Sequence, residues 1–247
     1  MRVTFVGTGD AFGSGARAHT CFRLDSGECT LVVDFGATVL PAWRRIGLDL
    51  GDINAVVLSH LHGDHFGGLP FLILDYQFVS RRKKPLVIAG PPGTAARLHT
   101  AMEIFFPESS ANDWRFDWSV TEIKPGEPAV LAEFSVVSTE VEHPSGAPST
   151  ALRISKDGSL FAYSGDTGWT DRLIGVADGA DLFTIECSSG ETRLPHHLDW
   201  PTLKANLPRL RAKRVAVTHM GDSALARIPE IRAAGVHVTY DGEIVDL

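Results

Sequence analysis

Cysteine is scarce in this sequence, with only Cys21, Cys29 and Cys187 among 247 residues. The number is odd, the three residues are far apart, and no C-x-x-C pattern occurs. This usage argues against a disulfide framework and against a thiolate zinc site. It predicts a protein of a reducing compartment, and we expect the cytoplasm.

Long hydrophobic runs are also missing. A membrane span needs about 18 consecutive apolar residues, whereas runs such as residues 71–74 are only long enough for a protein core. The first residues lack the apolar stretch of a signal peptide. An excess of positive charge is absent too, because 23 Lys and Arg residues face 30 Asp and Glu residues, which gives a net charge of −7. We therefore expect no membrane partner and no nucleic-acid binding by charge alone.

The composition that remains is that of an ordinary globular protein, with 44% hydrophobic and 21% charged residues. No repeat, low-complexity segment or flexible linker divides the chain, so residues 1–247 are predicted to form a single domain. Apolar β-branched segments alternate with helical patterns, and some neighbouring strands are joined by hairpin turns. This pattern predicts an α/β fold of two mixed β-sheets with helices on the outside.

The predicted elements follow from hydrophobic periodicity and turn residues. Strands are expected at residues 3–6, 20–24, 30–34, 53–58, 86–89, 134–137, 150–154, 160–164, 182–185, 215–218 and 236–240. Helices are expected at residues 38–45, 69–79, 91–106, 202–210 and 224–234. Polar clusters follow several of the strands, which is where active sites of α/β proteins gather.

The strongest chemical signal is HLHGDH at residues 60–65. It places four side chains that can bind a metal, His60, His62, Asp64 and His65, within six residues after a buried strand. Imidazole and carboxylate groups suit zinc and also iron or manganese. We predict that this segment is a loop that folds its ligands inward around a metal site.

This segment resembles the metallo-β-lactamase superfamily, and three later motifs extend the resemblance over most of the chain. His143, Asp166 and His219 each follow a predicted strand, in the order in which the superfamily supplies its remaining ligands. The resemblance implies a four-layer αββα sandwich and two divalent ions, with zinc expected and Mn²⁺ or Fe²⁺ as alternatives. It implies that one ion is bound by His60, His62 and His143, that the other is bound by Asp64, His65 and His219, and that Asp166 bridges them.

The motifs at residues 6–10, 59–70 and 164–167 resemble the ribonuclease Z-like phosphodiesterase branch of the superfamily. That branch carries a Glu–His pair that delivers a proton to the leaving group. Glu186 matches the glutamate, and His197 matches the histidine, with His196 as its competitor. A carboxylate beside an imidazole raises the pKa of the imidazole and fixes its tautomer, so the pair suits a general acid.

The resemblance implies that a hydroxide held between the two ions is the nucleophile, because two dications lower the pKa of a shared water. Asp64 is expected to bind one ion and to orient that water. Two further residues are also expected near the site: Asp10, facing the metals, and Trp169, near the substrate.

One departure from the branch concerns the substrate. In tRNA-processing ribonuclease Z, a long arm lies between the third histidine and the bridging aspartate, whereas 166 − 143 = 23 residues separate His143 from Asp166 here. Two strands and the turn at residues 156–159 fill that interval. We therefore expect a small-molecule or short nucleic-acid-like phosphodiester, cyclic or linear, in place of a tRNA.

Two other functions remain open from the sequence. The same two-metal site could hydrolyse a β-lactam, a lactone or a thioester, and a non-catalytic metal-binding scaffold could keep the fold. A homodimer is expected by analogy with the superfamily, with the apolar helices as its contact.

Overall fold

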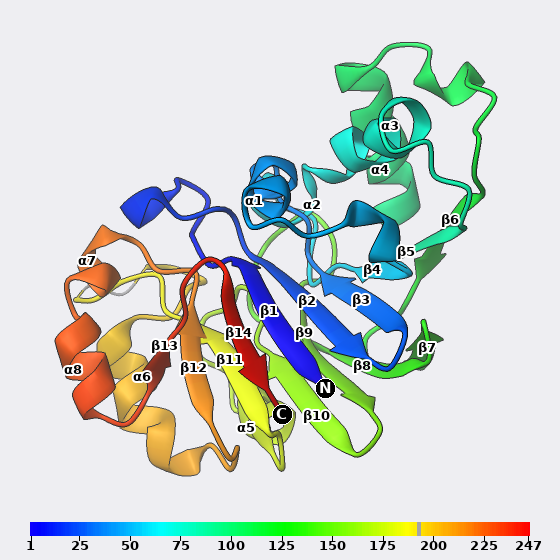
Figure 1. The fold of residues 1–247 in the computed structure, drawn as a ribbon. Coiled ribbons are helices and arrows are strands. Elements are labelled where there is room, and N and C mark those ends of the chain that lie inside the picture. The colour runs from blue at the N-terminus through cyan, green and yellow to red at the C-terminus, as the bar shows by residue number, and fades with distance from the viewer. Residues whose placement is uncertain (192–193) are drawn as a thin grey trace.

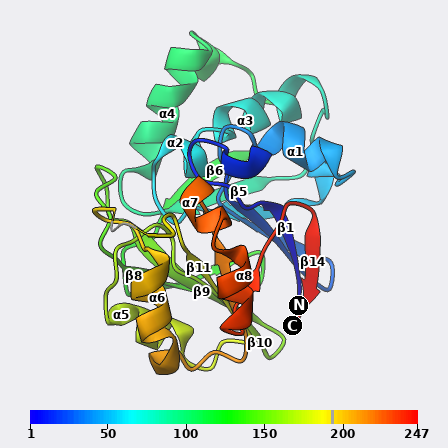
Figure 2. The ribbon, with the colours of Figure 1, turned by 90° about the vertical axis from the view of Figure 1, so that its left-hand side faces the viewer.

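The computed structural model describes residues 1–191 and 194–247 (Figure 1). The strands of the described chain form two sheets of seven strands each. Each sheet combines parallel and antiparallel pairs, so both are mixed, as predicted. The two sheets lie against one another, and the helices lie outside them (Figures 1 and 2).

The first sheet contains the N-terminal strands and the last strand of the chain. Its order is β14-β1-β2-β3-β4-β5-β6, with β1 (Arg2–Gly7), β2 (Cys21–Ser26), β3 (Cys29–Val33), β4 (Ala55–Val57), β5 (Leu86–Gly90), β6 (Trp118–Glu122) and β14 (Glu243–Asp246). Strands β3 to β6 are parallel, and β14 to β1, β1 to β2 and β2 to β3 are antiparallel pairs.

The second sheet has the same mixture of directions. Its order is β13-β12-β11-β10-β9-β8-β7, with β7 (Pro128–Leu131), β8 (Phe134–Glu140), β9 (Thr150–Lys156), β10 (Ser159–Tyr163), β11 (Leu182–Glu186), β12 (Val215–Thr218) and β13 (His237–Val238). Strands β10 to β13 are parallel, and β7 to β10 form antiparallel pairs. The turn between β9 and β10 is the predicted short hairpin, so no arm is inserted there.

The helices connect the strands on the outer faces. They are α1 (Val39–Arg45), α2 (Gly63–Phe66), α3 (Leu69–Phe78), α4 (Thr94–Phe105), α5 (Arg172–Ala177), α6 (Trp200–Asn206), α7 (Asp222–Leu225) and α8 (Ile228–Ala233). Short 3₁₀ turns lie at Ser14–Ala16, Leu50–Asp52, Ser109–Ala111 and Leu207–Arg209. In the described part of the chain, no helix is long and apolar enough to span a bilayer.

Three hydrophobic clusters define the layers. The first packs Val32 of the first sheet against Trp43 of α1 and Tyr76 of α3. The second packs Phe183 of the second sheet against Trp200 of α6. The third, which includes Phe5, Phe22, Phe161 and Tyr163, lies between the two sheets. One core between sheets and one core on each outer face confirm the four-layer αββα arrangement.

Several predicted elements differ from the structure. Residues 60–65 are not wholly a loop, because α2 begins at Gly63 and carries Asp64 and His65. The helix expected at residues 202–210 ends at Asn206, where Pro208 forces a 3₁₀ turn. The helix expected at residues 224–234 is divided into α7 and α8. Strands β6, β7 and β14 and helix α5 were not predicted.

Candidate metal centre

The candidate site residues follow the carboxyl ends of strands at one edge of the two sheets. The segment that begins at Ser59 follows β4, His143 follows β8, Asp166 follows β10, and His219 follows β12. Pairing of β11 with β12 sets Glu186 opposite Thr218, next to His219. The fold thus brings together residues that are up to 159 positions apart (219 − 60).

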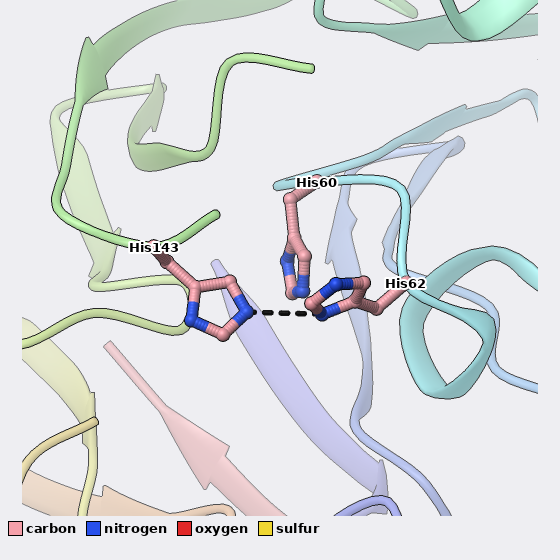
Figure 3. A group of neighbouring side chains, drawn as sticks. All are labelled: His60, His62 and His143. Carbon is pink, nitrogen blue, oxygen red and sulfur yellow. Dashed lines mark hydrogen bonds between the residues drawn. The ribbon is translucent and has the colours of Figure 1, made fainter. Parts of the chain in front are cut away.

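The first group contains His60, His62 and His143, whose ligand atoms lie within 4.8 Å of one another (Figure 3). His143 Nε2 lies 3.0 Å from His62 Nδ1. His60 and His143 are buried, and His62 is half-buried. Figure 3 shows the three rings converging from two separate loops, which is the arrangement that a three-histidine metal ligand set needs.

The second group contains Asp64, His65, Asp166 and His219, all of them buried. The Oδ2 atom of Asp64 lies 3.2 Å from the Nε2 atoms of His65 and His219. Asp166 Oδ2 lies 3.3 Å from both of these nitrogens. It also lies 3.8 Å from His60 Nε2, so Asp166 stands between the two groups.

Three buried ligand atoms show that these residues fit divalent metal ions. His60 Nε2, His65 Nε2 and Asp166 Oδ1 are buried without a hydrogen-bond partner. Such atoms are costly to leave unpaired. All three belong to the two clusters, and imidazole nitrogens with carboxylate oxygens are ligands of zinc, iron and manganese.

Burial and the neighbouring charges set the protonation state of each group in the site. Burial and the neighbouring His65 hold the pKa of His60 well below its usual value, which keeps His60 neutral. Burial opposes ionisation of Asp166, but His219 and His65 outweigh it and hold the pKa of Asp166 well below the usual range. Burial also disfavours the charged form of His219 and so lowers its pKa, but Asp166 and Asp64 together raise that pKa to about 9. The carboxylates therefore hold positive charge at this position.

Asp34 supports the site and was missed in the sequence. It follows β3, whose register pairs Val33 with Val57 and so brings Asp34 beside Ser59. Asp34 Oδ2 lies 2.7 Å from His65 Nδ1 and accepts a hydrogen bond from Ser59 Oγ at 2.8 Å. Ser59 Oγ in turn lies 3.1 Å from His60 Nδ1. A carboxylate on the far nitrogen fixes the tautomer of a ligating histidine.

Two further contacts position the histidine group. The backbone carbonyl of His196 lies 3.0 Å from His143 Nδ1, and His196 adopts a left-handed conformation with φ of 64°. Arg97 of α4 donates hydrogen bonds to the carbonyls of Leu61 (3.1 Å) and Ser145 (2.8 Å). Arg97 therefore joins the loop that carries His60 and His62 to the loop that carries His143.

The Glu186–His197 pair lies beside the metal centre. His197 Nδ1 is 3.0 Å from Glu186 Oε1, which also accepts a hydrogen bond from the backbone of Thr167 at 2.6 Å. The His197 ring centroid lies 4.8 Å from that of His143 and 5.8 Å from that of His219. Burial lowers the pKa of His197, but its hydrogen bond to Glu186 outweighs this, so the pKa is raised.

The structure distinguishes His197 from its competitor. The ring of His197 contacts Glu186, whereas His196 contributes its carbonyl to His143.

Asp10, which was expected to face the metals, instead has its carboxylate engaged by its own loop. It accepts hydrogen bonds from the backbone of Phe12 (3.2 Å) and from the backbone and hydroxyl of Ser14 (2.9 and 2.8 Å).

A four-layer αββα arrangement with histidines and aspartates clustered at its strand ends is the metallo-β-lactamase fold. The family described as Anti-Pycsar protein Apyc1 matches residues 1–237, and the chain belongs to this family.

Individual relatives agree with this assignment. The chain is 32% identical to Anti-Pycsar protein Apyc1 of Paenibacillus sp. (strain J14), over 70% of each chain. It is 25% identical to a ribonuclease Z of Halorubrum lacusprofundi, over 98% of this chain and 93% of that protein. The metallo-β-lactamase fold protein YhfI of Bacillus subtilis superposes with a TM-score of 0.82 at 20% identity, over 99% of this chain and 98% of YhfI. The resemblance predicted from the motifs is therefore confirmed.

Proposed function

We propose that this protein is a dinuclear metal-dependent phosphodiesterase that acts on a small or short nucleic-acid-like phosphodiester. The observation that carries the proposal is the Glu186–His197 pair, whose Oε1 and Nδ1 atoms lie 3.0 Å apart. The His197 ring lies beside His143 of the first group and His219 of the second. The similarity to a ribonuclease Z over nearly the whole chain supports the same reaction type.

The chain's own residues have distinct roles in this proposal. His60, His62 and His143 would hold one ion, Asp64, His65 and His219 would hold the other, and Asp166 stands between the two groups. When bound, two divalent ions lower the pKa of a water molecule and stabilise the negative charge that develops on the phosphoryl group. Asp64 also orients the attacking water.

The leaving group is the task of Glu186 and His197. The Glu186 carboxylate accepts a hydrogen bond from the Nδ1–H of His197. The Nε2–H of the protonated ring is then the group that can donate a proton to the departing oxygen. Ser188 Oγ donates to Glu186 Oε2 at 2.6 Å and so fixes the carboxylate. A buried, hydrogen-bonded carboxylate holds the imidazole in one orientation.

The small size of the expected substrate follows from the connection between His143 and Asp166. Strands β9 and β10 fill this connection, and only a tight turn joins them. The chain thus offers no arm at the position where tRNA-processing relatives carry one. A mononucleotide-sized or short diester, cyclic or linear, needs no such arm.

The test compares His197→Ala with wild type on two leaving groups. We expect about two metal ions per chain in both proteins by elemental analysis, and activity that a chelator removes. On a dinucleoside monophosphate, whose leaving group is an alkoxide, turnover should fall by about 10²–10⁴-fold. On bis(p-nitrophenyl) phosphate the loss should be much smaller, because p-nitrophenolate leaves without a proton.

The matched control is His99→Ala, which removes an exposed histidine of α4 and should behave as wild type. Equal losses on both leaving groups would contradict the role of His197 as the proton donor. If the protein binds two metals and hydrolyses a β-lactam, lactone or thioester but no phosphodiester, it is a hydrolase of carbon-centred bonds and the phosphodiesterase proposal is wrong. A protein that takes up neither zinc nor manganese would refute the proposed metal site, whereas one that binds metal and hydrolyses none of these substrates would fit a metal-binding scaffold.

A further inference from the structure

A cavity of about 570 Å³ lies next to the Glu186–His197 pair. Its lining residues come from three segments around β8, β10 and α6: Glu142, Gly168, Trp169, Leu194, Pro195, His196, His197, Asp199 and Thr202. A volume of this size matches that of small-ligand sites in proteins. Since His197 lines the cavity and also contacts the metal centre, the two spaces are neighbours.

Trp169 is the aromatic side chain in this lining, and its position is fixed by polar contacts. Its Nε1 donates a hydrogen bond to Asp171 Oδ1 at 3.1 Å. The guanidinium of Arg209 lies over the Trp169 ring at 5.7 Å and pairs with Asp171 Oδ2 at 2.7 Å. Asp171 thus holds both groups, so the indole is presented in one orientation at low entropic cost.

The cavity lining contains apolar surface besides the Trp169 ring. Leu194 and Pro195 contribute apolar surface, although the Leu194 side chain is 41% exposed to solvent. A Cβ added to Gly168 would lie 3.7 Å from His196 Cα, so the segment with Trp169 passes directly beside the His196–His197 segment. A flat group that enters here meets an aromatic ring and aliphatic surface at the same time.

We propose that this cavity is the leaving-side subsite and that Trp169 stacks on a nucleobase of the departing nucleoside. The inference rests on the proposed function, because a proton donor defines the side on which the leaving group departs. His197 lies on the cavity side of the metal centre, so the group that receives its proton occupies the cavity. Stacking on an indole suits any nucleobase, because every base has a π-face.

The test uses two substrates with the same reactive group. Adenosine 2′,3′-cyclic phosphate and glycerol 1,2-cyclic phosphate are both five-membered cyclic diesters, and only the first carries a base. In Trp169→Leu, kcat/KM for the adenosine substrate should fall about tenfold or more, mainly through KM. The same variant should keep kcat/KM for the glycerol substrate within about twofold.

Two further variants separate stacking from structure. Trp169→Phe restores a ring without the indole N–H and should recover most of the adenosine activity. Phe12→Leu removes an aromatic side chain that is 93% exposed on a different loop, and it should leave both substrates unaffected. Metal content per chain is measured in each variant and should stay unchanged.

The outcomes separate the subsite from the reaction. If wild type hydrolyses both substrates and Trp169→Leu loses both or neither, the subsite proposal is overturned and the phosphodiesterase stands. If wild type hydrolyses neither cyclic substrate, the dinucleoside monophosphate assay decides the proposed function, and calorimetric titration with adenosine decides the subsite. Binding by wild type that Trp169→Leu abolishes would support the subsite, and equal binding or none would overturn it.

Discussion

Asp34 is a buried residue whose backbone has a φ of 58°. Its carboxylate contacts the candidate metal ligand His65 at the ring nitrogen that points away from the metal site. Its Oδ2 lies 2.7 Å from His65 Nδ1, so the carboxylate accepts a hydrogen bond from the Nδ1–H. In the neutral ring, Nε2 then carries no proton. Nε2 is the atom that faces Asp64 and Asp166. A single acceptor thus selects the tautomer of His65 that can bind a metal.

Asp34→Asn tests this arrangement. The amide can present an N–H to His65 Nδ1, which would favour the tautomer with its proton on Nε2, where the metal binds. We expect metal affinity to fall by about 10–100-fold, measured by competition with a chromophoric chelator. Asp49→Asn, at an exposed turn where Asp49 accepts a hydrogen bond from Gly51, is the control. Unchanged affinity in a folded Asp34→Asn protein would show that Asp34 does not set the tautomer.

At the scale of residues, sequence analysis found the groups that follow a dense motif or a strand end. The dense motif placed His60 in the site, and the resemblance to the superfamily added His143, Asp166 and His219, each of which follows a predicted strand. It missed contacts that depend on the folded backbone, such as Arg97 to Ser145, 48 positions apart, and the carbonyl of His196 to His143, 53 positions apart. A carbonyl leaves no signal in the sequence, because every residue has one.

At the scale of elements, α4 links two ligand loops. Arg97 reaches from this helix to the carbonyls of Leu61 and Ser145, and these loops carry His62 and His143. In Arg97→Met the side chain keeps its apolar stem but loses its donors, so the loops should separate more readily. We expect dialysed protein to retain about one metal ion per chain where wild type retains about two.

The control for this prediction is Arg172→Met, which removes another arginine that donates to a backbone carbonyl, that of Glu140 at 3.0 Å. Elemental analysis after dialysis measures the metal content, and circular dichroism confirms folding. Retention of two ions by Arg97→Met would mean that the loops hold their positions without this helix.

The elements that sequence analysis missed share weak patterns. β14 is a four-residue edge strand, and its Ile244 side chain is 57% exposed. β6 alternates between half-buried and exposed residues, but it has only five residues and none is fully buried, so its hydrophobic signal is weak. Helix α5 has six residues and contains Gly175, which lowers helix propensity. Tertiary pairing determines these elements more than local sequence does.

At the scale of the molecule, low pH should weaken the hydrogen bonds by which Asp181 connects neighbouring strands of the second sheet. Asp181 accepts hydrogen bonds from the backbone of Leu160 (2.7 Å) and from Lys213 (2.6 Å). The Lys213 contact, followed by the Leu160 N–H, holds the pKa of Asp181 below its usual value. The ionised form is therefore favoured by folding. Its stabilisation is present above the unfolded pKa of about 3.9 and is lost as pH falls through the lower folded pKa.

Asp181→Asn should lower the free energy of unfolding by about 1 kcal/mol at pH 7, a modest value because Lys213 is largely exposed. The difference from wild type should shrink as the pH falls through the lowered folded pKa of Asp181, and vanish once Asp181 is protonated in both states. Urea unfolding at several pH values measures it. Asp178→Asn, which breaks the exposed pair with Arg211, should change stability by less than about 0.5 kcal/mol at any pH. A difference that persists in acid would contradict the charge-based account.

The layered architecture was predictable as a whole because alternating strand and helix patterns allow few arrangements. The single domain over residues 1–247, the homodimer and the cytoplasmic location stay predictions. The division of strands between the sheets was not predictable. Strand β14 joins the first sheet by pairing with β1, from Arg2–Asp246 to Phe5–Glu243, although it follows the whole second sheet in the chain. Long-range pairing of this kind leaves no local pattern.

The pairing of β1 with β14 also has a consequence for biosynthesis. The first sheet cannot be completed until the ribosome has added the last strand, and His219 joins the other candidate ligands only shortly before that. The backbone N–H of His219 then donates to the carbonyl of Thr8 at 3.0 Å, so segments that are synthesised at very different times meet beside the centre. A nascent chain therefore lacks a complete binding site until His219 has been synthesised, and metal loading would report that the two sheets have assembled.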